Sequence, residues 1–195
     1  GVLPIDYVIT TRELAWMIKK NKINFLDLKS EPADNPLGEA SGAAAIYGAS
    51  GGVMESALRT AQYLMLTAQD KVCRDLNKTT ICASANNAKI EFENVRGLKG
   101  VKKAEIEVGG SKVRVGVVSG IGNIYAVLNN LQDYDYIEVM ACPGGCIGGG
   151  GQPIPTTPAI RQKRLEALYK IDKGSEIRQA HDNKTAIEVL AWLKE

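Results

Sequence analysis

The spacing of hydrophobic and polar residues predicts alternating helices and strands along the chain. Apolar residues recur at helical spacing over 11–20 and 53–69, and the first of these helices begins with Thr10-Thr11-Arg12-Glu13, which is typical of a capping box. Amphipathic helices are also predicted over 157–172 and 185–194. This alternation indicates an α/β protein. The apolar runs that predict strands lie at 5–10, 23–28, 89–95, 104–108, 112–118 and 136–141.

Glycine-rich segments mark the turns and loops between these elements. Gly109-Gly110 predicts a tight hairpin turn between the strands at 104–108 and 112–118. Residues 29–52 contain too many glycines for a steady helix and too little periodicity for a strand, so a long structured loop is expected there. A further helix is expected over 122–131. No repeat or linker divides the chain, whose 195 residues are enough for one domain or two small lobes.

Composition argues against several classes of function. The formal charge of +2 is close to balance and the basic residues are scattered, which gives no support for a nucleic-acid or membrane partner. No apolar run reaches the roughly 18 residues that a membrane span needs, and the first residues lack the features of a secretory signal. Four cysteines are too few for a disulfide scaffold. We therefore expect a globular cytoplasmic protein in which cysteines serve another purpose.

The cysteine loop Cys142-Pro143-Gly144-Gly145-Cys146 is the main candidate for chemistry. It follows a predicted strand, and open α/β sheets usually build their sites at the carboxyl ends of strands. Two thiolates at this spacing reach one metal centre if the backbone turns tightly, which Gly144 and Gly145 permit. A zinc site more often has two residues between its cysteines, and Gly149 replaces the third cysteine of a radical-SAM motif. Spacing alone leaves a loop with two small buried thiols as an equal alternative.

Residues 138–153, EVMACPGGCIGGGGQP, resemble the third cluster-binding motif of FeFe hydrogenases, Glu-x-Met-x-Cys-x-x-Gly-Cys-x-x-Gly-Gly-Gly-Gln-Pro. Residues 38–43 and 48–60 resemble the cluster-facing loop and the following helix of that family. Shorter matches at 95–102, 120–123 and 178–183 extend the resemblance over nearly the whole chain. The resemblance implies that residues 1–195 form the carboxyl-terminal half of the catalytic domain. This lobe would contain a small, mostly parallel sheet flanked by helices, a hairpin and carboxyl-terminal helices.

The resemblance also implies the roles of individual residues. Cys142 would be a terminal ligand of a four-iron cubane, and Cys146 would be shared between the cubane and a two-iron subcluster that bears carbon monoxide, cyanide and azadithiolate. Met140 would pack beside the two-iron unit and, with Cys146, form the catalytic pair. This H-cluster would interconvert H2 with protons and electrons. The positions expected to contact the cofactor are Gly42, Ala43, Gly51, Gly52, Gly145, Gly150 and Gln152.

Two earlier cysteine motifs of the family, which carry the other cubane ligands and a proton-relay cysteine, are absent from this sequence. Cys73 and Cys82 lack the surroundings of those motifs, and we interpret them as ordinary thiols. The chain alone is therefore expected to be inactive, whether it is a fragment or a separate subunit. Its expected partners are the missing amino-terminal half or a subunit that supplies it, and a ferredoxin-like or other redox protein.

Other interpretations remain open. An iron-sulfur assembly scaffold or a sensor shares the cysteine loop without H2 turnover, although residues 51–55 and Met140 look more like a hydrogenase or hydrogenase-like sensor than a scaffold. Residues 120–125, GIGNIY, follow an apolar strand as a dinucleotide fingerprint does, but Tyr125 replaces the third glycine, so a strand-to-helix turn is favoured. His181, the only histidine, is interpreted as a hydrogen-bonded residue at a helix connection.

Overall fold

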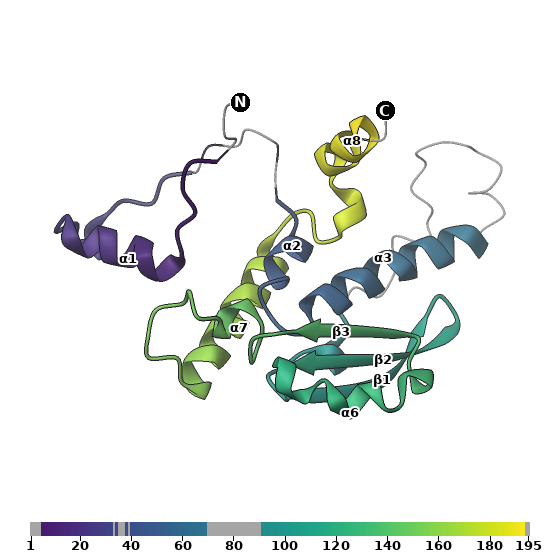
Figure 1. Ribbon diagram of the computed structural model, residues 1–195. Coiled ribbons are helices and arrows are strands. Elements are labelled where there is room, and N and C mark those ends of the chain that lie inside the picture. Colours follow the sequence, from purple (N-terminus) through teal and green to yellow (C-terminus); the bar gives the residue numbers. More distant parts are fainter. Residues whose placement is uncertain (1–4, 33, 35–37, 39, 70–90, 194–195) are drawn as a thin grey trace.

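The computed structural model describes residues 5–32, 34, 38, 40–69 and 91–193. These residues form an α/β unit beside which the amino-terminal helix stands apart (Figure 1). No helix in the described ranges is long and apolar enough to cross a membrane. The helices of eight residues or more are α1 (Thr11–Lys20), α3 (Gly52–Gln69), α7 (Pro158–Gly174) and α8 (Lys184–Trp192), and the shorter α2 spans Gly42–Ile46.

The sheet within the described residues has three strands in the order β1-β2-β3. The hairpin of β1 and β2 is antiparallel, whereas β3 pairs in parallel with β2, so that Ser119 lies opposite Met140. A parallel pair needs a crossover, which here runs through the short α6 (Tyr125–Leu128). The carboxyl ends of β2 and β3 therefore lie side by side. The strands span Val101–Val108, Ser111–Ser119 and Tyr136–Met140.

The main hydrophobic core lies between α3 and one face of the sheet. Val115 and Val117 alternate along β2 and pack against Met54 and Leu58 of α3. The opposite face is covered near Gly116, where a Cβ would lie 2.9 Å from the ring of Tyr134. The buried residues of the main core are Met54, Leu58, Phe92, Val95, Ile106, Val108, Val115 and Val117.

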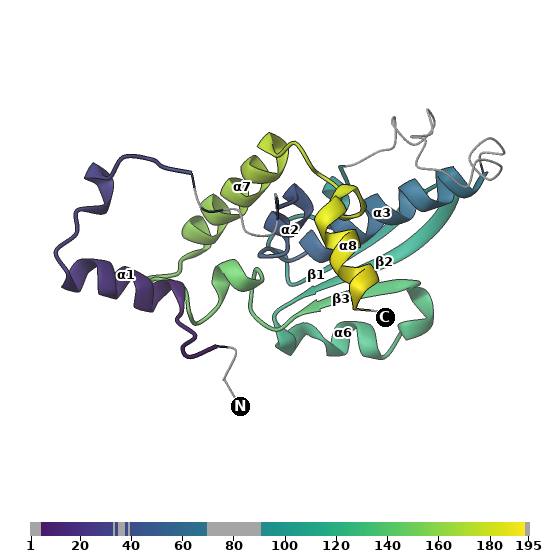
Figure 2. The same cartoon turned by 90° about the horizontal axis from the view of Figure 1, so that it is seen from above.

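A second, smaller core joins α7 to the segment between α2 and α3. Ala49 and Ile147 pack there against Leu165 of α7. Figure 2 shows α2 lying between α7 and α3, while α1 extends to the far side of α7. Side chains cap several helix starts: Thr10, Ser41, Thr157 and Asn183 each accept a hydrogen bond from a backbone N–H of the first turn.

Most of the predicted elements are confirmed. The α/β class is correct, and the helices predicted over 11–20 and 53–69 match α1 and α3. The capping box is present, because Thr10 and Glu13 exchange side-chain and backbone hydrogen bonds. The hairpin turns at Gly109 and Gly110, which both adopt positive φ. The predicted strands at 104–108, 112–118 and 136–141 and both carboxyl-terminal helices are also present, and residue 194 lies outside the described part.

Other predicted elements are wrong. Residues 5–10 and 23–28 are not strands, because no neighbouring strand pairs with them among the described residues, and Phe25–Asp27 forms a 3-10 helix. The described part of the strand expected at 89–95 contains a 3-10 helix, Glu93–Val95, whose burial comes from packing on α3. The loop expected at 29–52 contains α2, and the helix expected at 122–131 is broken into short turns. The small sheet, which was expected to be mostly parallel, is mixed, with one antiparallel and one parallel pair of strands.

Candidate iron-sulfur site

The cysteine loop begins directly after β3 and turns tightly. Gly144 and Gly145 both have a φ of +87°, a conformation that glycine adopts at low cost. The Gly145 N–H donates to the Cys142 carbonyl at 2.9 Å, and the Gly149 N–H donates to the Cys146 carbonyl at 3.0 Å. The loop thereby holds a half-buried thiol, Cys142, and an exposed thiol, Cys146. The tight turn predicted from the glycines is confirmed.

Two neighbouring segments hold the first half of this loop. The buried Ser119 hydroxyl, at the end of β2, accepts a hydrogen bond from the Gly144 N–H at 2.7 Å. The Gly144 carbonyl accepts from the Ser50 N–H at 3.0 Å, and the Ile147 N–H donates to the Gly48 carbonyl at 3.0 Å. The segment before α3 and the cysteine loop therefore lie side by side, although about a hundred residues separate them in the sequence.

Glu138 fastens β3 to the start of α3. Its buried carboxylate accepts hydrogen bonds from the N–H groups of Gly51, at 2.6 Å, and Met54, at 2.7 Å. The first N–H groups of a helix have no partner inside the helix, and a carboxylate there also interacts favourably with the helix dipole. Glu138 belongs to the motif recognised in the sequence, but that motif assigned it no role. In the structure it fixes the start of α3 relative to the cysteine loop.

Lys102 adds a half-buried positive charge beside the same segment. Its ammonium group on β1 donates to the carbonyl of Val95 and, at 2.9 Å, to that of Gly97. Burial lowers the pKa of Lys102 to about 8, although the negative charge of Glu138 acts in the opposite direction. A Cβ on Gly51 would lie 3.3 Å from this nitrogen. The ammonium group therefore links β1 to the turn that leads into the sheet, next to the start of α3.

The glycines near the loop differ in how much space surrounds them. A Cβ on Gly51 would lie 2.0 Å from the Val95 carbonyl oxygen, one on Gly52 1.7 Å from that of Ile46, and one on Gly145 2.7 Å from the Ser50 nitrogen. Close backbone packing inside this chain requires glycine at all three positions. At Gly150, by contrast, a Cβ would meet no atom of the described residues within 4 Å. Within the described part of the chain, Gly150 thus borders open space, and Cys146 is exposed.

The remaining predicted site residues lie in different places. Met140 is half-buried at the end of β3, directly before the loop, and Gln152 is half-buried at the loop's far end. Gly42 and Ala43 are buried in α2, and the Gly42 N–H donates to the Ile177 carbonyl at 2.7 Å. A Cβ on Gly42 would lie 2.5 Å from a carboxylate oxygen of Asp172. Gly42 thus contacts α7, while Met140 and Gln152 flank the cysteine loop.

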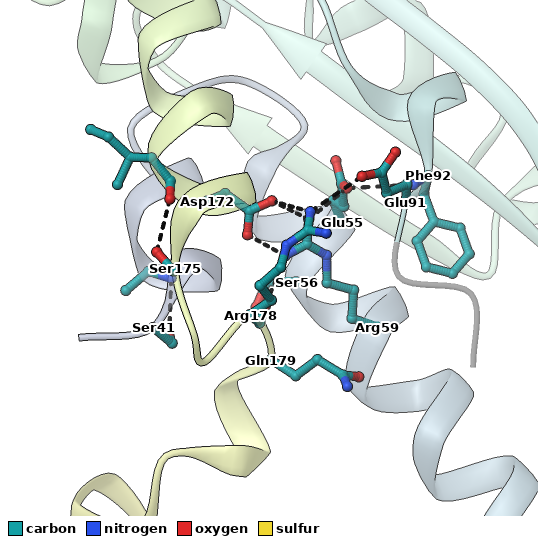
Figure 3. Close-up of polar contacts among 12 residues, drawn as sticks. Ser41, Glu55, Ser56, Arg59, Glu91, Phe92, Asp172, Ser175, Arg178 and Gln179 are labelled. Carbon is teal, nitrogen blue, oxygen red and sulfur yellow. Dashed lines mark hydrogen bonds and ion pairs between the residues drawn. The ribbon is translucent and has the colours of Figure 1, made fainter. Parts of the chain in front are cut away.

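A buried ionic network anchors α3 to α7 behind this site (Figure 3). The fully buried Arg59 donates to both oxygens of Asp172, at 2.7 and 2.9 Å, and to Glu55 at 2.9 Å. Arg178 donates to Asp172 at 2.6 Å, and Arg96 donates to Glu55 at 2.6 and 2.7 Å. The sequence carried a signal for Glu55, Arg59, Arg96 and Arg178, as matches to the hydrogenase family, but none for Asp172. Their partners are brought together by the fold.

The carboxylates of this network are ionised in spite of their burial. Burial raises the pKa of Asp172, but hydrogen bonds from Arg59 and Arg178 outweigh it, and the pKa lies below its usual range. Burial likewise raises the pKa of Glu55, and hydrogen bonds from Arg96 and Arg59 reverse the effect. The network therefore consists of charged groups at neutral pH.

The other residues considered in the sequence have structural partners. His181 Nδ1 lies 3.1 Å from the Thr60 hydroxyl, and its ring stacks on Tyr63 at 4.2 Å, which confirms a hydrogen-bonded histidine at a helix connection. Burial lowers the pKa of His181, although Asp182 acts in the opposite direction. Residues 120–125 form the expected strand-to-helix turn, in which the Gly120 N–H donates to the Met140 carbonyl at 2.8 Å. Cys73 and Cys82 lie outside the described residues.

The donors around the loop fit part of an iron-sulfur site. Cys142 and Cys146 project from one tight turn, and thiolates are the usual ligands of such clusters. Within the described ranges no three side chains of His, Cys, Asp or Glu gather at one point to hold a metal ion. The two thiols would therefore supply only part of a ligand set.

The comparisons with known families agree with this site. Residues 3–150 match the family described as "Iron only hydrogenase large subunit, C-terminal domain", and residues 158–190 match "Iron hydrogenase small subunit". The chain therefore belongs to the iron-only, or FeFe, hydrogenase large-subunit family. The cysteine loop lies in the first matched region and α7 in the second.

Curated relatives and solved structures support the same assignment. The chain is 43% identical to the NADP-reducing hydrogenase subunit HndD of Solidesulfovibrio fructosivorans, over 95% of this chain and 29% of the relative. It is 40% identical to iron hydrogenase 1 of Clostridium pasteurianum, over 97% and 32%. The FeFe-hydrogenase HydA1 of Chlamydomonas reinhardtii, in its variant E141A, superposes with a TM-score of 0.61 and 34% identity, over 96% of this chain and 51% of the hydrogenase. The chain thus spans about a third of its curated relatives.

More distant relatives carry a different name. Protein NAR1 of Arabidopsis thaliana is 29% identical over 98% of this chain and 39% of its own length. The cytosolic Fe-S cluster assembly factor NAR1 of Coccidioides immitis is 31% identical over 97% and 35%. The higher identity lies with the hydrogenases.

Proposed function

We propose that this chain is the carboxyl-terminal part of an FeFe-hydrogenase catalytic domain that interconverts H2 with protons and electrons. The observation that carries the proposal is the cysteine loop at the carboxyl end of β3, which turns so that Cys146 is exposed and Cys142 is half-buried. The identity of 40–43% to hydrogenases, against 29–31% to assembly factors, favours catalysis over a scaffold role.

The proposed ligand roles follow the position of each thiol. Cys142 would bind the four-iron cubane, and Cys146 would be shared between the cubane and the two-iron unit. The H-cluster supplies the hydrogen chemistry, and the protein supplies its position and hydrogen bonds. Met140 directly precedes the loop and would pack beside the two-iron unit. Gly150, which has open space beside it among the described residues, and the half-buried Gln152 would let the backbone approach the cluster.

The exposed apolar surface of the amino-terminal region favours the presence of a second polypeptide segment that packs against this lobe. Helix α1 has no buried residue, although one of its faces is apolar. A groove of about 530 Å³ between α1 and residues 23–26 is lined by apolar side chains that include Leu14, Ile18 and Phe25. Exposed apolar surface of this kind marks interaction sites. We assign it to the amino-terminal half of the catalytic domain, which would bring the missing cysteine motifs.

The test is to assemble the complete site. The chain is co-expressed anaerobically with a polypeptide that carries the two missing cysteine motifs, together with the maturation proteins. Infrared bands of bound carbon monoxide and cyanide, and H2 evolution from a reduced dye, are the expected results. Cys146→Ser should abolish both signals, whereas the matched Cys73→Ser should retain them.

The same experiment separates the alternative function. An iron-sulfur assembly factor would bind iron through Cys142 and Cys146 but would show no infrared bands of carbon monoxide or cyanide. Iron incorporation without those bands would therefore contradict the hydrogenase proposal and support the scaffold. An electron partner of the ferredoxin type is proposed only for the first outcome.

A further inference from the structure

The segment that follows the cysteine loop, residues 147–153, depends on support from other parts of the chain. Residues 148–151 are four consecutive glycines, and glycine loses more conformational freedom on folding than any other residue. Within the loop, the Gly149 N–H donates to Cys146 and the Gln152 N–H donates to Gly149. Among the described residues no atom lies within 4 Å of a Cβ position on Gly150, whereas one on Gly148 would lie 2.0 Å from the Pro143 carbonyl oxygen, and the Gly151 carbonyl accepts from the Arg12 N–H at 2.9 Å. Packing within the described residues therefore leaves Gly150 itself unrestricted, between neighbours that are held.

One side chain binds both ends of the glycine run. Arg164, in the middle of α7, donates from Nη1 to the Ile147 carbonyl at 2.7 Å and from Nη2 to the Pro153 carbonyl at 2.9 Å. A guanidinium group is planar and rigid, so its two arms fix the separation of the two acceptors. Ile147 directly follows Cys146. The bond to its carbonyl therefore restrains the backbone next to the exposed thiol.

Helix α7 is itself firmly held, so Arg164 is presented from a rigid element. Leu165, the next residue, is buried against Ala49 and Ile147. Further along α7, the carboxylate of Asp172 accepts two hydrogen bonds from the buried Arg59. Restraint of a functional loop is most effective when the restraining group stands on a fixed helix or strand.

We propose that Arg164 is a positioning residue that orders the loop 146–153 and so orients Cys146. Arg164 lies in the region that matches the small-subunit family, whereas its acceptor Ile147 lies in the region that matches the large-subunit family. Helix α7 thereby restrains the geometry of the loop. The assignment of Cys146 as a cluster ligand rests on the proposed function. The ordering of the loop by Arg164 is a property of the polypeptide itself and is testable without iron.

The first test is hydrogen–deuterium exchange of the whole chain, followed by mass spectrometry of the peptide that covers 144–153. Arg164→Gln keeps a polar side chain but shortens it and removes the charged fork, and Lys163→Gln makes the same change of charge at the neighbouring exposed position of α7. Exchange in this peptide should rise roughly tenfold in Arg164→Gln and stay unchanged in Lys163→Gln. Arg164→Lys, which retains one charged donor, should restore part of the protection.

A second readout follows the thiol. Alkylation of Cys146 by iodoacetamide, assigned by peptide mass spectrometry, should change in rate in Arg164→Gln relative to Lys163→Gln, while that of Cys142 changes less. Equal exchange and alkylation in the two variants would overturn the proposal. Faster exchange spread equally over β1 and β2 would also overturn it, because that result indicates general destabilisation. If Arg164→Gln does not fold, Arg164→Lys provides the same comparison.

These outcomes are independent of the proposed function. A lack of carbon monoxide and cyanide bands in the assembled protein would remove the hydrogenase assignment but leave the exchange result intact. In an assembled protein that does show the bands, Arg164→Lys should also shift the midpoint potential of the cubane, whereas Lys163→Gln should not.

Discussion

Two amphipathic helices of this chain have opposite fates. Helix α3 packs on the sheet, and its Leu58 is only 4% exposed. Helix α1 carries apolar residues at similar spacing, yet its Leu14 remains 47% exposed. The capping box and the basic residues of its last turn are sufficient to define α1 locally. The difference shows that periodicity specifies a helix, whereas burial depends on a second surface.

The polar contacts of the two regions differ in the same way. Beside α3, the buried carboxylates of Glu55 and Asp172 are both paired with Arg59. Loss of any one of these side chains would leave a buried charge with fewer partners. In α1 the side-chain contacts are local and exposed, such as those between Thr10 and Glu13, and one backbone bond, from the Arg12 N–H to the Gly151 carbonyl at 2.9 Å, reaches the glycine run. Among the described residues, the charged groups of the α3 region are thus buried and paired, while the apolar face of α1 stays exposed.

The largest effect is expected from a substitution that breaks the buried ionic network between α3 and α7. Arg59→Met leaves Asp172 and Glu55 buried with fewer partners, and removal of one member of a buried ion pair costs about 3–5 kcal/mol. The free energy of unfolding, measured with urea, should fall by that amount. Lys112→Ala, which removes one member of an exposed pair with Glu105, is the control and should cost at most about 1 kcal/mol. A similar small loss in both variants would show that the network is not coupled to folding.

A smaller effect is expected from acid, which should lower the stability that the same buried network provides. The pKa of Asp172 is lower in the folded chain than its ordinary value near about 3.9, so the unfolded chain binds more protons between the two values. The stability from Asp172 and Glu55 is therefore fully present above about pH 5 and is lost as the pH falls toward their lowered values. Urea midpoints at pH 7, 5, 4 and 3 measure the loss. The acid dependence should be shallower in Asp172→Asn, and an unchanged slope would contradict this account.

The smallest expected effect lies in α1. Leu14→Ala truncates an apolar side chain that is still 47% exposed in the described chain, so the free energy of unfolding should fall by about 1 kcal/mol or less. Leu58→Ala, the matched change in α3, should cost about 2–5 kcal/mol. In the assembled protein Leu14→Ala should weaken binding of the amino-terminal half. A large loss of stability in the isolated chain would mean that α1 is already packed.

Much of the cysteine loop could be predicted from the sequence because its constraints are local. Gly144 and Gly145 occupy positive φ, which only glycine adopts readily, and the turn between Cys142 and Cys146 follows from them. The capping box at Thr10 and the hairpin at Gly109-Gly110 are likewise short-range features. Each depends on residues a few positions apart, so the amino acids alone determine them.

The contacts that support the loop were decided only by the tertiary structure. Glu138 binds the N–H groups of Gly51 and Met54, more than eighty residues away, and Arg59 meets Asp172 across 113 positions. The apolar residues at 5–10 and 23–28 have strand character but no partner strand in the described part of the chain, so pattern alone predicted them wrongly. Local conformation follows from side-chain and backbone sterics. Pairing, burial and long-range hydrogen bonds depend on which distant segments the fold brings within reach.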